Sequence, residues 1–131
     1  MNIAAMLAEF HNAFGEPFGH NGGRTNELRA KLHLEENREL VEALLDGDRT
    51  AIAHELADVV YVAYGSAHSL GIPLDAVIAE VHAANMRKFP DGKPVLRDDG
   101  KVLKPEGWRP ADVARVLAAA PGPRDEENTD G

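Results

Sequence analysis

Five acidic side chains are spaced so that together they could bind a cation. Glu35, Glu36 and Glu39 form one set, and Glu55 and Asp58 form a second set after an interval of fifteen residues. If both segments are helical, steps of three and four residues place each set on one helix face. Like charges at these spacings repel, and the repulsion costs more when the side chains are partly buried. The two sets therefore predict a cation between them.

The chemistry of the ligands narrows the choice of cation. Carboxylate oxygens are hard ligands, so we expect Mg²⁺, with Mn²⁺ as the other candidate, rather than Zn²⁺. Mg²⁺ held by carboxylates keeps coordination positions for water and for substrate phosphates, which indicates phosphoryl chemistry. The alternative is that the acids are solvated helix faces that form ordinary ion pairs with Arg29, Arg38 and Arg49.

Two predicted helices must position these acids. One is expected over residues 26–46, where the acids interrupt an apolar stripe that should meet the core, and the other over residues 48–70. Gly47 suits the end of the first helix, and Asp48 suits the N-cap of the second. Because the connection is short, the helices should be antiparallel neighbours, so four or five carboxylates should converge on one site.

The rest of the chain completes an all-α architecture. Apolar periodicity and helix-stop residues predict three more helices, over residues 3–14, 73–88 and 111–120. Two short extended runs flank Asp98-Asp99-Gly100 and predict a hairpin, and the glycine-rich stretch 18–24 predicts a mobile loop or lid. We expect a bundle of about four to five helices with a small hairpin appendage near the C-terminus.

Composition sets limits on function. The chain has 131 residues and a net charge of −8, which fits one domain over residues 1–120 and a disordered acidic tail over residues 121–131. The acidity argues against binding a nucleic-acid polymer, and no apolar run is long enough to cross a membrane. Without cysteines or a recognisable secretory signal, we expect a cytoplasmic protein.

Polar residues after the acidic sets are candidates for substrate binding. Asn85 and Lys88 continue the inward face of the helix over residues 73–88, where an amide suits a sugar or base and an ammonium suits a phosphate. Lys93, Lys101 and Lys104 then form a cationic patch on the hairpin. The alternative for each lysine is an ordinary exposed side chain on a loop.

Several other residues are weaker candidates. Arg24 lies in the glycine-rich loop and is a possible phosphate contact, and Trp108 is expected to be a packing anchor rather than a platform for a base. Ser66, Ser69 and Thr50 are expected to lack a neighbouring His and acid, which argues against covalent catalysis. The six histidines have no spacing typical of a metal site.

The acidic motifs resemble a known superfamily. Glu35-Glu36-x-x-Glu39 with Glu55-x-x-Asp58, then Asn85-x-x-Lys88 and the Lys-Pro-x-Gly-Trp segment over 104–108, resemble the all-α NTP pyrophosphohydrolases. That superfamily includes MazG proteins, phosphoribosyl-ATP pyrophosphohydrolases and dimeric dUTPases. The segments 54–65 and 81–113 are most similar to the short MazG-like branch, whose described activity is dUTP hydrolysis. The resemblance covers roughly residues 28–115.

The resemblance implies roles for individual residues and a function. It implies that Glu36, Glu39, Glu55 and Asp58 bind metal, that Glu35 is a candidate general base, and that the protein is a homodimer. We expect a Mg²⁺-dependent pyrophosphohydrolase that converts dUTP to dUMP and pyrophosphate, with Asn85, Lys88, Lys101 and Lys104 binding the nucleotide. The alternatives are another or a damaged dNTP, such as dCTP, phosphoribosyl-ATP, or a non-catalytic, metal-stabilised regulatory dimer.

Overall fold

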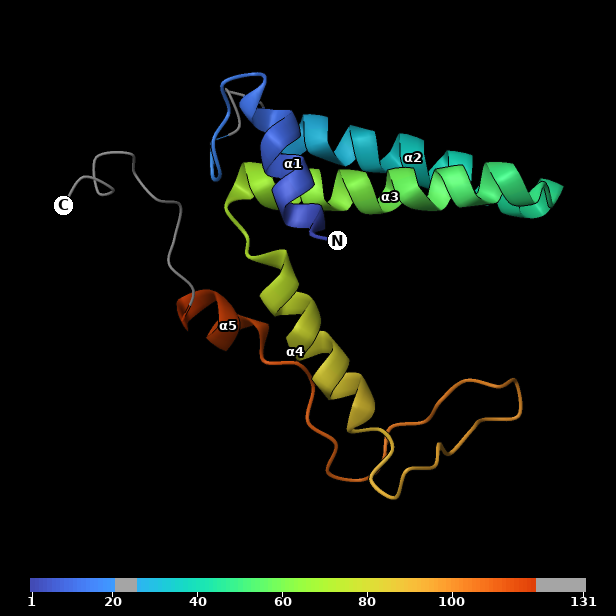
Figure 1. The fold of residues 1–131 in the computed structure, drawn as a ribbon. Coiled ribbons are helices and arrows are strands. Elements are labelled where there is room, and N and C mark those ends of the chain that lie inside the picture. Colours follow the sequence, from blue (N-terminus) through green and yellow to red (C-terminus); the bar gives the residue numbers. More distant parts are fainter. Residues whose placement is uncertain (21–25, 120–131) are drawn as a thin grey trace. The chain divides into compact units, whose positions relative to one another are not determined.

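The computed structural model describes residues 1–20 and 26–119 and contains no strand within them. Five helices make up this part of the chain: α1 (Ile3–Asn12), α2 (Asn26–Asp46), α3 (Arg49–Leu70), α4 (Leu74–Met86) and α5 (Val113–Ala119) (Figure 1). The predicted all-α class is therefore confirmed, and the helix bounds differ from the expected ones by a few residues at most. No helix in the described ranges is both long and apolar enough to cross a bilayer.

The helices belong to two compact units, residues 1–72 and residues 73–119 of the described chain. The first unit contains α1, α2 and α3, and the second contains α4, α5 and the hairpin. The prediction of one domain over residues 1–120 stays a prediction. The predicted tail, residues 121–131, and Arg24 lie outside the described residues.

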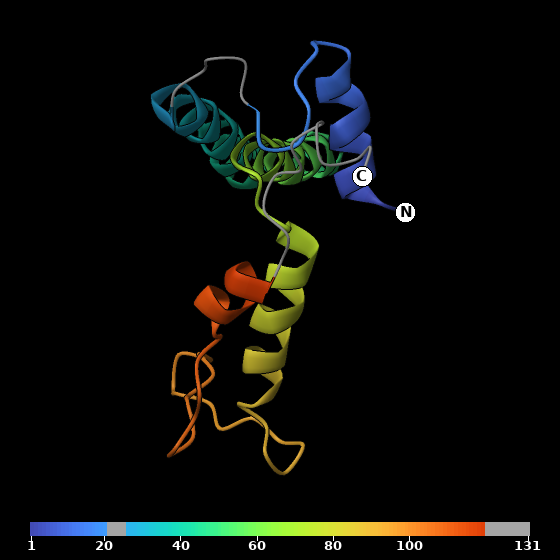
Figure 2. The ribbon, with the colours of Figure 1, turned by 90° about the vertical axis from the view of Figure 1, so that its left-hand side faces the viewer.

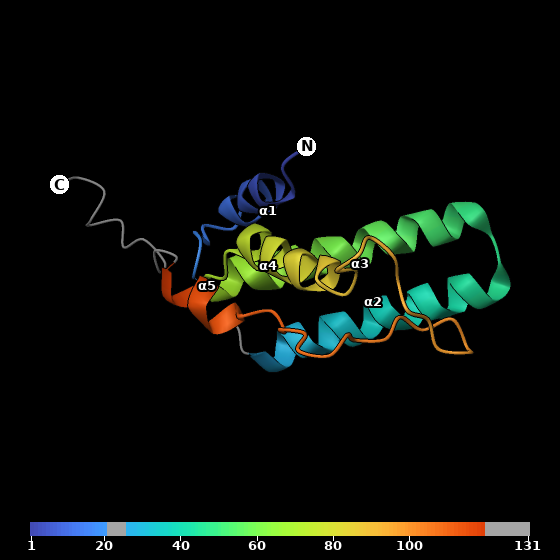
Figure 3. The ribbon, with the colours of Figure 1, turned by 90° about the horizontal axis from the view of Figure 1, so that it is seen from below.

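In the first unit, α3 lies between α1 and α2 (Figures 2 and 3). α2 and α3 run antiparallel, joined by Gly47 and Asp48. Gly47 has a φ of 84°, which favours glycine, and the Asp48 side chain accepts a hydrogen bond from the Thr50 N–H at 3.0 Å. The cap residues that the sequence predicted at this connection are thus confirmed, and they set the pairing of the two long helices.

The segment after α1 is attached to the end of α3. The Gly19 N–H donates to the His68 carbonyl at 2.7 Å, and His68 Nε2 donates to the Glu16 carbonyl at 2.9 Å. His11 and His68 are both buried, and their rings stack with centroids 4.7 Å apart. Residues 18 and 19 of the expected loop contact α3, because the Phe18 ring also lies edge-on to His68, whereas the expected mobility of the loop stays a prediction. Residues 21–25 of the expected loop lie outside the described residues.

In the second unit, α5 lies beside α4 (Figure 2). The Glu80 carboxylate of α4 holds the two helices together, because it accepts from Arg115 at 2.9 Å and from the Asp112 N–H at 3.0 Å. The expected hairpin is present as an antiparallel bridge between Leu96 and Val102.

Trp108 anchors the segment between the hairpin and α5. Its indole Nε1 donates to the Ala84 carbonyl at 2.8 Å, which attaches the segment to α4. The expectation that Trp108 is a packing anchor is therefore confirmed.

Candidate metal centre

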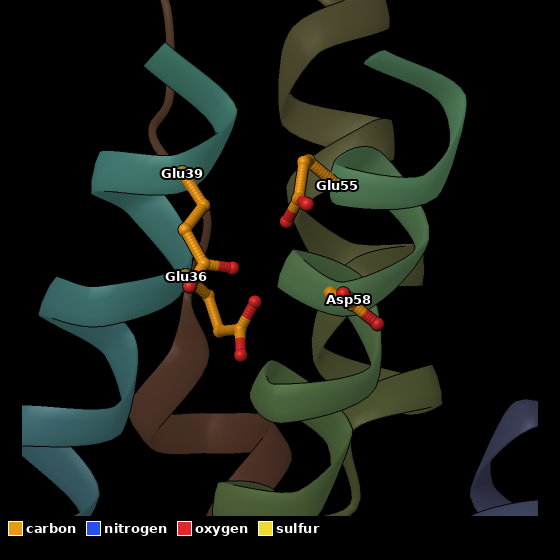
Figure 4. Close-up of side chains that lie close together, drawn as sticks. All are labelled: Glu36, Glu39, Glu55 and Asp58. Atoms are coloured by element: carbon orange, nitrogen blue, oxygen red, sulfur yellow. The ribbon is translucent and has the colours of Figure 1, made fainter. Parts of the chain in front are cut away.

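The candidate site lies between α2 and α3 in the first unit. α2 supplies Glu36 and Glu39, and α3 supplies Glu55 and Asp58. A step of three residues keeps the two members of each pair on one helix face. In the antiparallel arrangement these faces meet: Glu36 and Glu39 extend toward α3, Glu55 extends toward α2, and Asp58 lies near Glu55 on α3 (Figure 4).

The four carboxylates are close enough to share one ion. One oxygen from each residue lies within 4.8 Å of the corresponding oxygens of the other three. Glu36, Glu55 and Asp58 are half-buried, whereas Glu39 is exposed. The site is therefore partly withdrawn from water while one ligand candidate remains open to solvent.

Two oxygens in the cluster are buried without a hydrogen-bond partner. They are Oε2 of Glu36 and Oε2 of Glu55, one from each helix. A buried carboxylate oxygen without a partner is costly, and a bound cation would remove that cost. An all-oxygen set with unsatisfied oxygens on both sides fits a hard divalent cation such as Mg²⁺ or Mn²⁺.

The cluster also changes the acidity of its members. Burial, followed by the charges of Glu39 and Asp58, raises the pKa of Glu36 above its ordinary value. Burial and Glu39 likewise raise the pKa of Glu55. Both shifts have the causes expected for like charges held together in a partly desolvated place. Protons and a divalent cation should therefore compete for these two carboxylates.

The alternative of ordinary ion pairs does not describe this cluster. Arg29 donates to Ser66 Oγ at 2.9 Å and to the Val62 carbonyl at 3.0 Å, while Arg38 and Arg49 form no ion pair within the described residues. No Lys or Arg of the described chain lies at ion-pair distance from the four carboxylates. Within residues 1–20 and 26–119, the one basic side chain at ion-pair distance from the cluster is His54, whose Nε2 lies 3.2 Å from Asp58 Oδ2.

The histidines were considered from the sequence only as metal ligands, so the pairing of His54 with Asp58 was missed, although their spacing of four residues is a usable signal.

Glu35 does not belong to the converging group. Its side chain is exposed, and it is not among the residues whose oxygens lie within 4.8 Å of one another. Glu35 is nevertheless near enough for its charge to contribute to the raised pKa of Glu36. Of the five acids that the sequence singled out, the structure thus brings four together and leaves the fifth beside them.

The expected substrate residues belong to the second unit. Asn85 is exposed in the last turn of α4, so the expectation that it packs inward is wrong. Lys88 and Lys104 both approach the Trp108 ring, with Nζ 5.4 Å and 4.9 Å from its centroid. Lys101 is exposed on the hairpin, as is Lys93 before it. Their roles stay predictions.

The expectation that Ser66 lacks a neighbouring histidine and acid is wrong for the histidine. Ser66 has a histidine neighbour, because His33 Nε2 lies 2.7 Å from Ser66 Oγ. The two residues are 33 positions apart and meet only because α2 and α3 pair. Burial, followed by the charge of Arg29, lowers the pKa of His33, which favours its neutral imidazole.

Fold and site together define a helical protein with a candidate divalent-cation centre made of carboxylates. The family model of phosphoribosyl-ATP pyrophosphohydrolase matches residues 7–85, which include α2, α3 and all four carboxylates. The chain belongs to this family, within the MazG-like all-α NTP pyrophosphohydrolase superfamily, and is a pyrophosphohydrolase. The resemblance found in the sequence is thereby confirmed. No match was found among curated proteins.

The raised pKa values predict how stability without metal depends on pH. Glu36 and Glu55 hold protons in the folded chain at a pH where the unfolded chain has released them. Their contribution to stability is therefore present below the ordinary carboxyl pKa and is lost as pH rises through the raised values. In EDTA, we expect this contribution to lower the melting temperature between mildly acidic and neutral pH.

His11 and His33 change the pH dependence of stability in the opposite direction to Glu36 and Glu55. A comparison with Glu36→Gln is therefore needed, because this variant alters only the acidic contribution. Their lowered pKa values favour the folded state more strongly as pH rises through their titration range. The melting temperature of Glu36→Gln should therefore depend on pH differently, with a smaller loss toward neutral pH. Identical pH profiles for the two proteins in EDTA would show that Glu36 titrates normally.

Proposed function

We propose that this protein is a Mg²⁺-dependent nucleoside triphosphate pyrophosphohydrolase whose preferred substrate is dUTP. The proposed dependence on Mg²⁺ is supported by the convergence of four carboxylates, two of which have buried oxygens without a hydrogen-bond partner. The family match supplies the reaction class. Mn²⁺ is the other candidate ion, because it accepts the same oxygen ligands.

The reaction is hydrolysis of the linkage between the α- and β-phosphates. A water oxygen forms a bond to phosphorus, the bridging P–O bond breaks, and the products are dUMP and pyrophosphate. When bound, the metal neutralises phosphate charge and lowers the pKa of water. Glu36, Glu39, Glu55 and Asp58 would hold it. Glu35, which is exposed and adjacent to Glu36 in the sequence, would accept the proton that the attacking water loses.

The second unit offers groups for the nucleotide. Asn85 presents an amide for the sugar or base, and Lys88, Lys101 and Lys104 present ammonium groups for the phosphates. Lys88 and Lys104 are already held beside the Trp108 ring, which restricts their movement. Ammonium groups fixed in this way would stabilise charge that develops on the leaving pyrophosphate.

The preference for dUTP is supported by the resemblance of residues 54–65 and 81–113 to the short MazG-like branch. The family description instead names phosphoribosyl-ATP, which makes that nucleotide the first alternative. Other or damaged deoxynucleotides, including dCTP, are further alternatives. A regulatory dimer without catalysis is an alternative of a different class.

The test is pyrophosphate release from a nucleotide panel. Purified protein with Mg²⁺ is given dUTP, dTTP, dCTP, dATP and phosphoribosyl-ATP, and the assay distinguishes pyrophosphate from orthophosphate. We expect pyrophosphate, with the highest kcat/KM on dUTP. Highest kcat/KM on phosphoribosyl-ATP would overturn the substrate, and no turnover of any nucleotide would favour the regulatory dimer.

We further propose that a second copy of the chain covers apolar surface of α2 and α3. Large side chains are exposed on both helices, including Leu34, Val41 and Leu45 on α2 and Leu56 and Val60 on α3. Such exposure is typical of an interface rather than of a monomer surface. Because the chain is only 14.2 kDa, its own core is small. A solution mass of one chain at micromolar concentration would contradict the homodimer.

A further inference from the structure

A second polar cluster connects α2 to α3 outside the group of four carboxylates. Arg29 of α2 is only 8% exposed, and its guanidinium donates from Nε to Ser66 Oγ at 2.9 Å and from Nη2 to the Val62 carbonyl at 3.0 Å. His33, one turn further along α2, contacts the same hydroxyl at 2.7 Å. We call Arg29, His33, Val62 and Ser66 the Arg29 junction.

Gly65 makes room for this junction. A Cβ atom at position 65 would lie 2.7 Å from Arg29 Nη2 and 3.4 Å from His11 Nε2. Glycine is unfavourable inside a helix, and a buried guanidinium must be hydrogen-bonded in several directions. A glycine inside α3 and a hydrogen-bonded, buried guanidinium occur at the same place. Gly65 therefore leaves the space that the Arg29 guanidinium occupies.

The junction and the interhelical connection lie on opposite sides of the acidic cluster along the helix pair. Gly47 and Asp48 join the helices at one end, and the Arg29 junction joins them toward the other end. On α2 the cluster begins two turns after Arg29, and on α3 it ends one turn before Val62. Four carboxylates that repel one another are thus held between two fixed points.

We propose that Arg29 is a positioning residue that sets the spacing of α2 and α3 and thereby preorganises the metal ligands. The inference rests on the proposed metal site and names a determinant of its affinity. Arg29 acts through geometry, because its buried guanidinium on α2 bonds both Ser66 and the Val62 carbonyl of α3. Groups hydrogen-bonded directly to metal ligands typically change metal affinity by about 10–100-fold, and Arg29, which acts through the helix pair, is expected at the low end of that range.

The test measures metal binding directly, without turnover. Free Mn²⁺ is followed by electron paramagnetic resonance during titration of the full chain, and the dissociation constant is compared among variants. Arg29→Lys keeps the positive charge but loses the planar fork that bonds Ser66 and Val62 together. Ser66→Ala keeps Arg29 and removes its side-chain acceptor. We expect Mn²⁺ to bind about 10-fold more weakly to both variants.

Leu7→Ala is the control for general loss of stability. Leu7 is 1% exposed on α1, and its Cδ1 would lie 3.6 Å from a Cβ atom at position 65. Leu7→Ala therefore weakens packing beside the Arg29 junction without removing any of the junction's hydrogen-bond donors or acceptors. We expect Leu7→Ala to lower the melting temperature and to leave the Mn²⁺ dissociation constant unchanged. If Arg29→Lys fails to fold, Ser66→Ala still decides the question.

The outcomes separate this inference from the proposed function. Mn²⁺ affinity within about twofold of native in both Arg29→Lys and Ser66→Ala would overturn the positioning role, as would equal weakening in Leu7→Ala. The native protein and Asp58→Asn decide the metal site itself. If Mn²⁺ binds the native chain and not Asp58→Asn, the metal site stands whatever Arg29 does; if it binds neither, the proposed metal chemistry fails.

Discussion

Replacing Glu39 by Gln, or Asp58 by Asn, is expected to abolish pyrophosphate release while the fold remains intact. Each change removes one of four converging carboxylates and leaves a neutral side chain of nearly the same shape. Groups that only orient a metal ligand already contribute about 10–100-fold, so loss of a ligand should reduce kcat/KM by more than about 100-fold. The measurement is steady-state pyrophosphate release at the Mg²⁺ concentration that just saturates the native protein.

The same variants should not lose stability when metal is absent. In EDTA the four carboxylates repel one another, and removing one charge relieves that repulsion. We therefore expect melting temperatures equal to or above that of the native protein in EDTA. Mg²⁺ or Mn²⁺ should raise the melting temperature of the native protein but have much less effect on the variants, because a ligand stabilises only the state that binds it.

A matched control comes from the same helix. Glu42 is exposed on α2 and does not belong to the group of four, so Glu42→Gln removes one negative charge without touching the proposed ligands. Its activity should stay close to native. Near-native activity of both Glu39→Gln and Asp58→Asn would remove the metal-site hypothesis, and equal loss in Glu42→Gln would mean that net charge, not ligation, controls activity.

Much of the acidic cluster could be predicted because its determinants are local. Three-residue spacings place Glu36 with Glu39 and Glu55 with Asp58, and Gly47 with Asp48 dictates a tight antiparallel turn. Local signals of this kind also identified the hairpin, whose turn residues lie between the Leu96–Val102 partners. Where a feature depends on residues within one or two turns, periodicity and capping were enough.

The Arg29 junction was missed because it depends on helix register across long separations. Considered by itself, Arg29 was interpreted as an ion-pair partner for nearby acids, and Ser66 as a serine without a neighbouring histidine. In the structure Arg29 and His33 both contact Ser66. Once α2 and α3 are aligned on the four acids, the same antiparallel register places Arg29 opposite Gly65 and Ser66. The sequence therefore contains the information that places Arg29 near Ser66, but it can be used only after the register of α2 and α3 is known.

Exposure was harder to predict than helix position. Asn85 continues an apolar stripe and was expected to point inward, yet its side chain is exposed. A periodic stripe identifies the face that seeks a partner, and it does not say whether that partner is in the same chain. The exposed apolar residues of α2 and α3 are a second case, and both fit a protein whose surfaces are completed by another copy.

Glu35 and Glu36, which are adjacent on α2, are expected to have different roles in catalysis. Glu35→Gln is expected to lower kcat by about 10²–10⁴-fold, the range typical of losing a general base, while Mg²⁺ and nucleotide still bind. Glu36→Gln is expected to weaken metal binding instead. Adjacent helical side chains diverge by about 100°, so Glu35 and Glu36 cannot occupy the same place. Glu36 is half-buried in the cluster, and Glu35 is exposed beside it.

Mg²⁺ titrations of activity distinguish the two roles. A weakened ligand set can be compensated by more metal, so Glu36→Gln should recover part of its activity as Mg²⁺ increases. A missing base cannot be replaced by metal, so Glu35→Gln should keep a native Mg²⁺ midpoint and a low plateau. Recovery of Glu35→Gln at high Mg²⁺ together with a low plateau for Glu36→Gln would reverse the assignment, making Glu35 the ligand and Glu36 the residue that takes the proton from water.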